Sequence, residues 1–131
     1  MQRDSPLHLT VDPGPLAIIR LEPTADVPTW TDQDRSFTSI TRTDEELSIV
    51  CPEHRVPATV PRSGGWACLK VSGPLDLTEV GILARLARSL QEGGISVFVV
   101  STFETDYLLV PGSALDRALM ALEGDGHRVA R

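Results

Sequence analysis

Residues 76–110 read DLTEVGILARLARSLQEGGISVFVVSTFETDYLLV, and this stretch carries the strongest structural signals in the chain. Asp76 and Glu79 match the D-x-x-E pattern of a capping box, which predicts that a helix begins here. Apolar residues then recur at helical spacing and predict one buried face, formed by Val80, Leu83, Ala84, Ala87 and Leu90. Gly93 and Gly94 can supply the left-handed conformation that commonly ends a helix.

Two apolar runs follow this helix. Residues 95–100 and 107–110 are rich in β-branched and apolar side chains, which favours two strands joined by the polar bend 101–106. Working outward, residues 66–71 predict a strand before the helix. A second amphipathic helix begins after Pro111-Gly112-Ser113, with Leu115, Ala118, Leu119 and Leu122 on its apolar face. Residues 127–131 can form a last short strand. Residues 63–131 therefore predict a βαββαβ unit.

The first half of the chain is a weaker copy of the second. Residues 37–50, FTSITRTDEELSIV, resemble residues 97–110, VFVVSTFETDYLLV, at an offset of sixty residues. At that offset Thr41 matches Ser101, and Glu46 matches Asp106. Such internal similarity indicates a degenerate duplication. We expect an α+β protein of two tandem ferredoxin-like halves, residues 1–62 and 63–131.

The first half is the less regular of the two. Pro23 and Pro28 interrupt the region that corresponds to the first helix of the second half. Proline inside a helix removes a backbone donor and clashes with the preceding turn. We therefore expect no full-length helix before Phe37.

Composition excludes several classes of function. The chain has 131 residues and a net charge of −6, with arginines scattered among acids, which argues against a nucleic-acid partner. It has no apolar run of about 18 residues, so we expect no membrane span. The N-terminus lacks the apolar region of a secretion signal, so we expect a cytoplasmic protein.

No motif indicates catalysis or a cofactor. The sequence has no Gly-x-Ser-x-Gly elbow and no phosphate-binding loop. Cys51 and Cys68 lack the CxxC spacing of a metal or redox site, and the three histidines lie far apart in sequence. We expect no enzyme activity, no catalytic residue, no metal and no cofactor.

The chain resembles the ACT domain family of βαββαβ regulatory modules that bind amino acids. More narrowly, it is similar to the subgroup that includes the CASTOR-type cytosolic arginine sensors and the regulatory domains of aspartate kinase. The resemblance covers nearly the whole chain. Its motifs are Gly73-Pro74-Leu75, Glu79-x-Gly81-Ile82, Ile95-Ser96, Ser101-Thr102-Phe103, Asp106, Leu109-Val110-Pro111 and, in the first half, Thr43-x-x-Glu46-Leu47-Ser48-Ile49-Val50.

The resemblance implies a non-catalytic amino-acid sensor that works as a homodimer, with its ligand at an ACT–ACT interface. The family's pocket combines a helix start with the bend after the next strand. Carried over by position, this pocket would use Glu79, Val80, Gly81, Thr102, Phe103 and Asp106. The resemblance does not identify a downstream protein partner.

The chemistry of these residues favours a cationic amino acid. Backbone N–H groups at a helix start suit the ligand carboxylate. Glu79 and Asp106 would face a cationic side chain, and a guanidinium pairs bidentately with a carboxylate. Arginine is therefore the first candidate and lysine the second. Neutral aliphatic amino acids come third, because they would leave two buried acids unpaired.

Other interpretations of the same residues stay open. Glu79 can act as a helix cap alone, and Asp106 is a common turn residue. Phe103 can be a rim residue of the core, and Gly81 can serve close helix–sheet packing. The chain would then be an oligomerisation or protein-interaction module without a ligand. A third possibility is a small enzyme that uses Glu79 and Asp106 as an acid–base pair.

Overall fold

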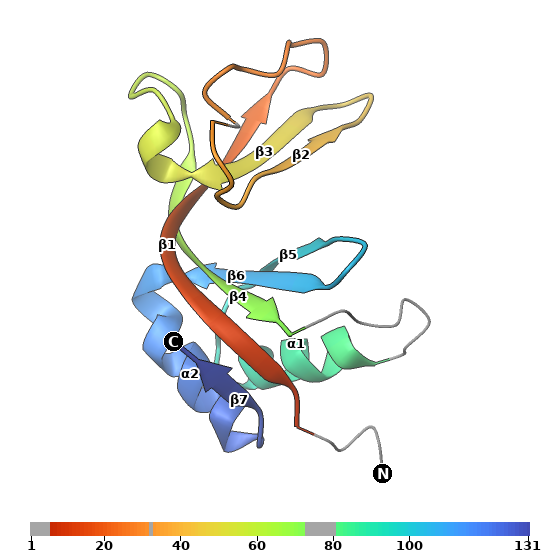
Figure 1. Cartoon of the computed structure of the whole chain (residues 1–131), viewed down its shortest axis with the longest axis vertical. Helices are drawn as coiled ribbons and strands as arrows, with labels where there is room; N and C mark the ends of the chain where they lie inside the picture. Colours follow the sequence, from red (N-terminus) through yellow and green to blue (C-terminus); the bar gives the residue numbers. More distant parts are fainter. Residues whose placement is uncertain (1–5, 32, 73–80) are drawn as a thin grey trace. The chain divides into compact units, whose positions relative to one another are not determined.

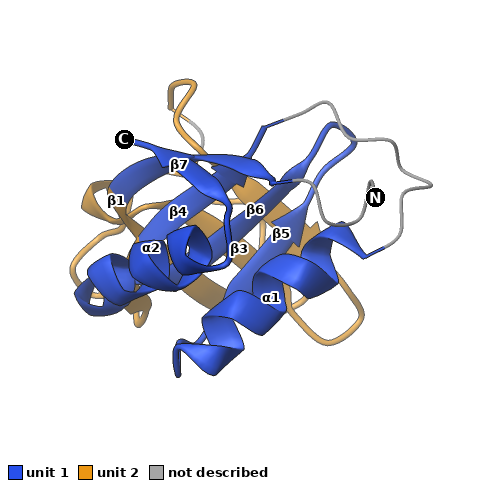
Figure 2. Ribbon diagram, turned by 90° about the horizontal axis from the view of Figure 1, so that it is seen from below, with its two compact units in different colours: residues 1–13, 67–131 blue, residues 14–66 orange. Residues whose placement is uncertain are grey.

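The computed structural model describes residues 6–31, 33–72 and 81–131. By the contacts among its residues the chain divides into two units. Unit 1 comprises residues 1–13 and 67–131, and unit 2 comprises residues 14–66 (Figure 2). The strands and helices, in chain order, are β1 His8–Leu21, β2 Ser39–Arg42, β3 Leu47–Pro52, η2 Glu53–Arg55, β4 Ser63–Val71, α1 Ile82–Glu92, β5 Phe98–Ser101, β6 Asp106–Pro111, η3 Gly112–Ala114, α2 Leu115–Gly124 and β7 Arg128–Ala130 (Figure 1).

Unit 1 has the order of strands and helices that the sequence predicts for the second half of the chain. From β4 onward the order is strand, helix, two strands, helix and strand, which is βαββαβ. Strands β5 and β6 form an antiparallel hairpin in which Ser101 lies opposite Asp106. The ferredoxin-like α+β fold is thereby confirmed.

The N-terminal strand joins unit 1, although the sequence pattern assigns it to the first half of the chain. The first part of β1 lies between β4 and β7, and it pairs with β7 in parallel, with Leu9 opposite Val129. On the other side, the N–H of Ser72 donates to the carbonyl of His8 at 2.8 Å. The boundary expected between residues 62 and 63 separates the two predicted halves in sequence, not these compact units, and it stays a prediction.

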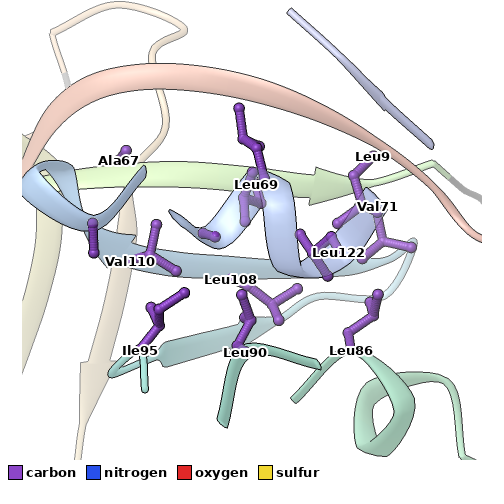
Figure 3. Packing of buried hydrophobic residues seen from close by; sticks show 13 residues of the cluster. Leu9, Ala67, Leu69, Val71, Leu86, Leu90, Ile95, Leu108, Val110 and Leu122 are labelled. Atoms are coloured by element: carbon purple, nitrogen blue, oxygen red, sulfur yellow. The ribbon is translucent and has the colours of Figure 1, made fainter. Parts of the chain in front are cut away.

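The core of unit 1 lies between its strands and its two helices (Figure 3). Leu69 of β4 and Leu108 of β6 meet Leu86 and Leu90 of α1, and all four side chains are fully buried. Helix α2 adds the residues that the sequence predicts for its apolar face. Of these, Ala118, Leu119 and Leu122 are buried, and Leu115 is partly buried against the same cluster.

The start and the buried face of α1 differ from the sequence prediction. The helix begins at Ile82, because Gly81 has φ 92°, a left-handed conformation that interrupts a helix. The predicted capping box and Val80 lie outside the described residues. Ala84, expected in the core, is exposed, whereas Leu86 is fully buried. The helix does end as predicted, with Gly94 in the left-handed conformation at φ 73°.

Unit 2 has the same hairpin but covers its sheet differently. Strand β3 lies between β2 and the second part of β1, and it pairs antiparallel with both. A smaller apolar cluster fills this unit, formed by Ala17, Ile19, Leu47, Ile49, Cys51 and Val56. Apart from residue 32, residues 22–38 contain turns and bends and no helix. This half is the degenerate copy.

Arginine side chains hold this loop in place of a helix. The buried guanidinium of Arg55 donates to the carbonyl of Thr31 at 2.8 Å and pairs with the carboxylate of Asp34. The N–H and hydroxyl of Ser36, and then Arg55, lower the pKa of Asp34 to about 2. Arg42 donates to the carbonyls of Pro23 and Ala25. These bonds satisfy loop carbonyls that a helix would have satisfied internally.

The hydrogen bonds of the two hairpins show that the offset between the two halves is 59 residues, one less than the sequence comparison predicts. The N–H of Thr43 donates to the carbonyl of Glu46 at 2.9 Å, and the N–H of Thr102 donates to that of Thr105 at 2.8 Å. These two threonines therefore occupy the same hairpin position, 59 residues apart rather than sixty. Leu47, and not Glu46, is the counterpart of Asp106, because Leu47 lies opposite Arg42 as Asp106 lies opposite Ser101.

Leu86→Ala tests the buried face of α1. Removing a fully buried leucine should lower the free energy of unfolding by about 2–5 kcal/mol, through lost burial and the cavity left behind. Ala84→Ser, on the exposed side of the same helix, should change it by less than about 0.5 kcal/mol. Urea denaturation of both variants measures the difference, and equal effects would contradict this packing.

Arg55→Met tests the arginine that holds the loop of unit 2. The variant keeps most of the side-chain volume but loses the charged hydrogen bonds, so it should lower the free energy of unfolding by about 2 kcal/mol. Arg20→Met is the matched control, because Arg20 is exposed and bonds the carbonyl of Glu45 at 3.0 Å. It should cost less than about 1 kcal/mol. A control effect as large as that of Arg55→Met would refute the assignment.

Candidate functional site

Four of the six predicted site residues are described, and they lie on two elements of unit 1. Gly81 precedes α1. Thr102 and Phe103 lie in the turn of the β5–β6 hairpin, and Asp106 is the first residue of β6, paired with Ser101. Glu79 and Val80 lie outside the described residues. Figures 1 and 2 show the hairpin turn and the start of α1 on the same side of unit 1.

Hydrogen bonds within the turn fix its shape. The hydroxyl of Thr102 donates to the carbonyl of Thr105 at 3.1 Å, in addition to the main-chain bond between these two residues. At the first paired position, the hydroxyl of Ser101 donates to Oδ1 of Asp106 at 2.6 Å. Because each of these bonds closes a short loop of chain, the turn presents its side chains from a defined backbone.

One buried threonine ties the turn to the strand that leads toward α1. The hydroxyl of Thr105, which is 3% exposed, donates to the carbonyl of Val71 at 2.6 Å. Val71 is the last residue of β4. The end of β4 and the hairpin turn are therefore held together. Sequence reasoning did not include Thr105 in the site, because a buried hydroxyl in a turn has no signature in spacing or composition.

Asp106 is a half-buried acid without a cationic partner among the described residues. In that part of the chain its carboxylate is engaged by the hydroxyl of Ser101, and no arginine, lysine or histidine pairs with it. The equivalent position of unit 2 holds no acid. It is occupied by Leu47, which is fully buried. An acceptor of this kind, fixed by a serine and open on one side, suits an ammonium or guanidinium group.

Phe103 is the most exposed large apolar side chain among the described residues. Its relative exposure is 79%, and it stands in the turn between Thr102 and Glu104. It therefore does not form part of the core of unit 1. An exposed aromatic side chain on a rigid turn offers an apolar wall for a ligand or an anchor for a partner.

Gly81 is required by its backbone conformation. At φ 92° a side chain would be strained, and among the described residues no heavy atom lies within 4 Å of the place a Cβ would take. Close helix–sheet packing therefore does not explain this glycine. As the N-cap of α1 it provides no side-chain hydrogen bond. The N–H groups of the first turn lack intrahelical acceptors, as in any helix, and they can serve a carboxylate.

The described residues contain no group of three or more histidine, cysteine, aspartate or glutamate side chains placed to hold a metal ion. No helix in the described part of the chain is long and apolar enough to cross a membrane.

Comparison with known proteins identifies the class to which this fold and turn belong, the ACT domains. The ACT domain family model matches residues 62–124, and a second model, for the N-terminal domain of a protein family, matches residues 14–59. Residues 62–124 of the chain therefore form a domain of the ACT family. A solved structure from Agobacterium tumefaciens shares 40% identity and a TM-score of 0.88, covering 95% of this chain and 92% of that protein.

Two further comparisons find similarity to regulatory proteins. The human cytosolic arginine sensor for mTORC1 subunit 1 is 34% identical over 59 residues, which is 44% of this chain. The match spans 18% of the length of that sensor. The regulatory subunit of aspartate kinase from Thermus thermophilus shares the fold, with a TM-score of 0.60 at 11% identity, over 89% of this chain and 96% of that subunit.

Thr105→Val tests the bond that ties the hairpin turn to β4. The variant keeps the shape of the side chain but leaves the carbonyl of Val71 without its donor, which should cost about 1–3 kcal/mol of stability. Thr41→Val on the exposed strand β2 is the control and should be within about 0.5 kcal/mol of the original protein. Thermal and urea unfolding compare the two. No difference between them would show that the buried hydroxyl does not hold the turn.

Proposed function

We propose that this protein is a non-catalytic, amino-acid-binding regulatory protein whose ligand binds at the hairpin turn of unit 1. The half-buried carboxylate of Asp106, without a cationic partner among the described residues, is the observation that carries the proposal. Gly81, Thr102 and Phe103 complete the described part of the site. Glu79 and Val80 are proposed from the sequence alone.

Each part of an amino acid has a proposed counterpart. The N–H groups at the start of α1 would bind the carboxylate, since a helix N-terminus favours anions. The exposed hydroxyl of Thr102 and nearby carbonyls of the turn would accept from the ammonium group. Phe103 would cover the methylene groups of the side chain, and Asp106 would pair with the charge at its end.

Arginine is the proposed ligand, with lysine as the second candidate. A guanidinium offers two parallel donors to one carboxylate, whereas an ammonium offers a single point of charge. The match of 59 residues to a cytosolic arginine sensor supports the same choice. Neutral amino acids would leave Asp106 without a partner on desolvation, which is unfavourable.

The proposed assembly is a cytoplasmic homodimer with the ligand at an interface between ACT domains of the two copies. Strand β5 pairs with β6 and ends the strand order, so that its other edge has no paired strand among the described residues. An edge of this kind invites association with a second strand. A two-fold axis would then create two equivalent ligand sites.

The exposure of Phe103 favours one alternative function, a protein-interaction module without a ligand. Such a module would use the aromatic ring as an anchor for a protein partner. It differs from the sensor in one measurable respect, because no amino acid would stabilise it.

A thermal-shift screen of the twenty amino acids tests the proposed ligand. A ligand that binds the folded state alone stabilises it by about 2.7 kcal/mol at about a hundredfold excess over Kd. Arginine should therefore raise the Tm by several degrees, lysine by less and neutral aliphatic amino acids not at all. A screen in which no amino acid changes the Tm would support the interaction module instead.

Asp106→Ala tests the residue that carries the proposal. The variant should unfold at nearly the original temperature without ligand but lose the shift with arginine, because the guanidinium would lack its carboxylate. Glu104→Ala is the matched control, since Glu104 is an exposed acid in the same turn, and it should keep the shift. Full arginine stabilisation of Asp106→Ala would place the ligand elsewhere.

Light scattering tests the proposed assembly. At micromolar concentration the mass should be twice the 14.2 kDa of one chain. A single-chain mass, both with and without arginine, would contradict the homodimer.

A further inference from the structure

A buried histidine fastens the N-terminal strand to unit 1. The backbone N–H of Leu7 donates to Nδ1 of His127 at 3.1 Å. His127 is buried, with a relative exposure of 5%. The N–H of Arg128 returns a bond to the carbonyl of Leu7 at 2.8 Å. These two bonds begin the ladder between β1 and β7, which continues with His8 opposite Arg128.

The bond to Nδ1 exists for one protonation state of the ring. A neutral imidazole with its proton on Nε2 offers Nδ1 as an acceptor, whereas the imidazolium carries a proton on both nitrogens. Protonation therefore brings two N–H groups face to face at the place where one hydrogen bond had been. The ring cannot turn to water instead without leaving its buried position.

Charged groups from both helical elements face this ring. Arg85 of α1 disfavours the imidazolium, while Asp125, at the end of α2, favours it. The carboxylate of Asp125 also accepts a hydrogen bond from the hydroxyl of Ser89, which occupies part of its capacity. Burial and then Arg85 outweigh Asp125 and hold the pKa of His127 below its ordinary value of 6.5. Of the neighbours along the strands, His8 and Arg128 are exposed.

We propose that His127 is a pH-sensitive latch, which holds residues 7–11 in the sheet of unit 1 at neutral pH and releases them in acid. Leu9 is 2% exposed, and Leu7 and Val11 pack against the same core, so that release uncovers one edge of that core. It also separates β7 from β1, the strand with which β7 pairs. The latch does not depend on any ligand.

The direction of the pH dependence follows from linkage. Because folding lowers the pKa of His127, the released or unfolded chain binds more protons than the latched one below pH 6.5. The latch is fully effective above pH 6.5. It weakens by up to about tenfold per pH unit as the pH falls from 6.5 toward the lowered pKa, because one proton is taken up on release.

Hydrogen exchange of the full-length protein tests the latch, with rates corrected for the intrinsic effect of pH on exchange. Between pH 7.5 and 5.5, the protection of residues 7–11 should fall in the original protein, by at most about tenfold, because one proton is taken up on release. Protection of β6, which lies elsewhere in the same sheet, should stay constant. Unchanged protection of residues 7–11 down to pH 5.0 would overturn the proposal.

Two substitutions separate the latch from general acid sensitivity. His127→Asn places an amide oxygen near the position of Nδ1, so it should keep an acceptor for Leu7 and remove the pH dependence. If this variant folds poorly, nitrogen chemical shifts of the original ring decide the question, since the latch requires the neutral form with its proton on Nε2. His54→Gln, at an exposed histidine, is the control and should retain the full pH dependence. Loss of the dependence in His54→Gln, or a neutral ring protonated on Nδ1, would refute the latch.

Discussion

Burial of one apolar sheet face in each unit is the interaction on which the rest of the structure depends. Unit 1 buries its face under two helices, with Leu86 and Leu90 packed on Leu69 and Leu108. Unit 2 buries a smaller face without an α-helix among its described residues, and the guanidinium of Arg55 orders the loop that lies there. Each solution satisfies the backbone carbonyls that cover the sheet, by helical hydrogen bonds in one unit and by arginine side chains in the other.

The hairpins of the two units also differ in chemistry. Thr43 and Thr102 make the same main-chain bond, so the two turns have a common backbone arrangement. The residues at their first paired position differ, because Leu47 enters the core of unit 2 while Asp106 stays half exposed beside Ser101. The two turns are therefore alike, and a single position decides which hairpin carries a half-exposed acid.

Much of the fold follows from the sequence, because periodicity, glycines and prolines act locally. The order βαββαβ, the apolar face of α2 and the ending of α1 at Gly94 are all predicted correctly. The start of α1 is not predicted correctly. The capping pattern indicates a start near residue 76, whereas the left-handed conformation of Gly81, which depends on the surrounding chain, places the start at Ile82. The parallel pairing of Leu9 with Val129 also escapes prediction, because no local pattern tells which of two similar halves a strand joins. In the candidate site, the position of the hairpin turn follows from the sequence and the choice of Asp106 stays a prediction, whereas the buried hydroxyl of Thr105 has no signature in the sequence.

In the proposed function, the hairpin of unit 1, and not its counterpart in unit 2, binds an amino acid. Titration of the isotope-labelled protein with arginine, followed by amide chemical shifts, tests this most directly. Saturable shifts are expected at Gly81, Thr102, Phe103 and Asp106, and none at residues 43–47. Shifts centred on residues 43–47, or the absence of any shift at the hairpin of unit 1, would contradict it.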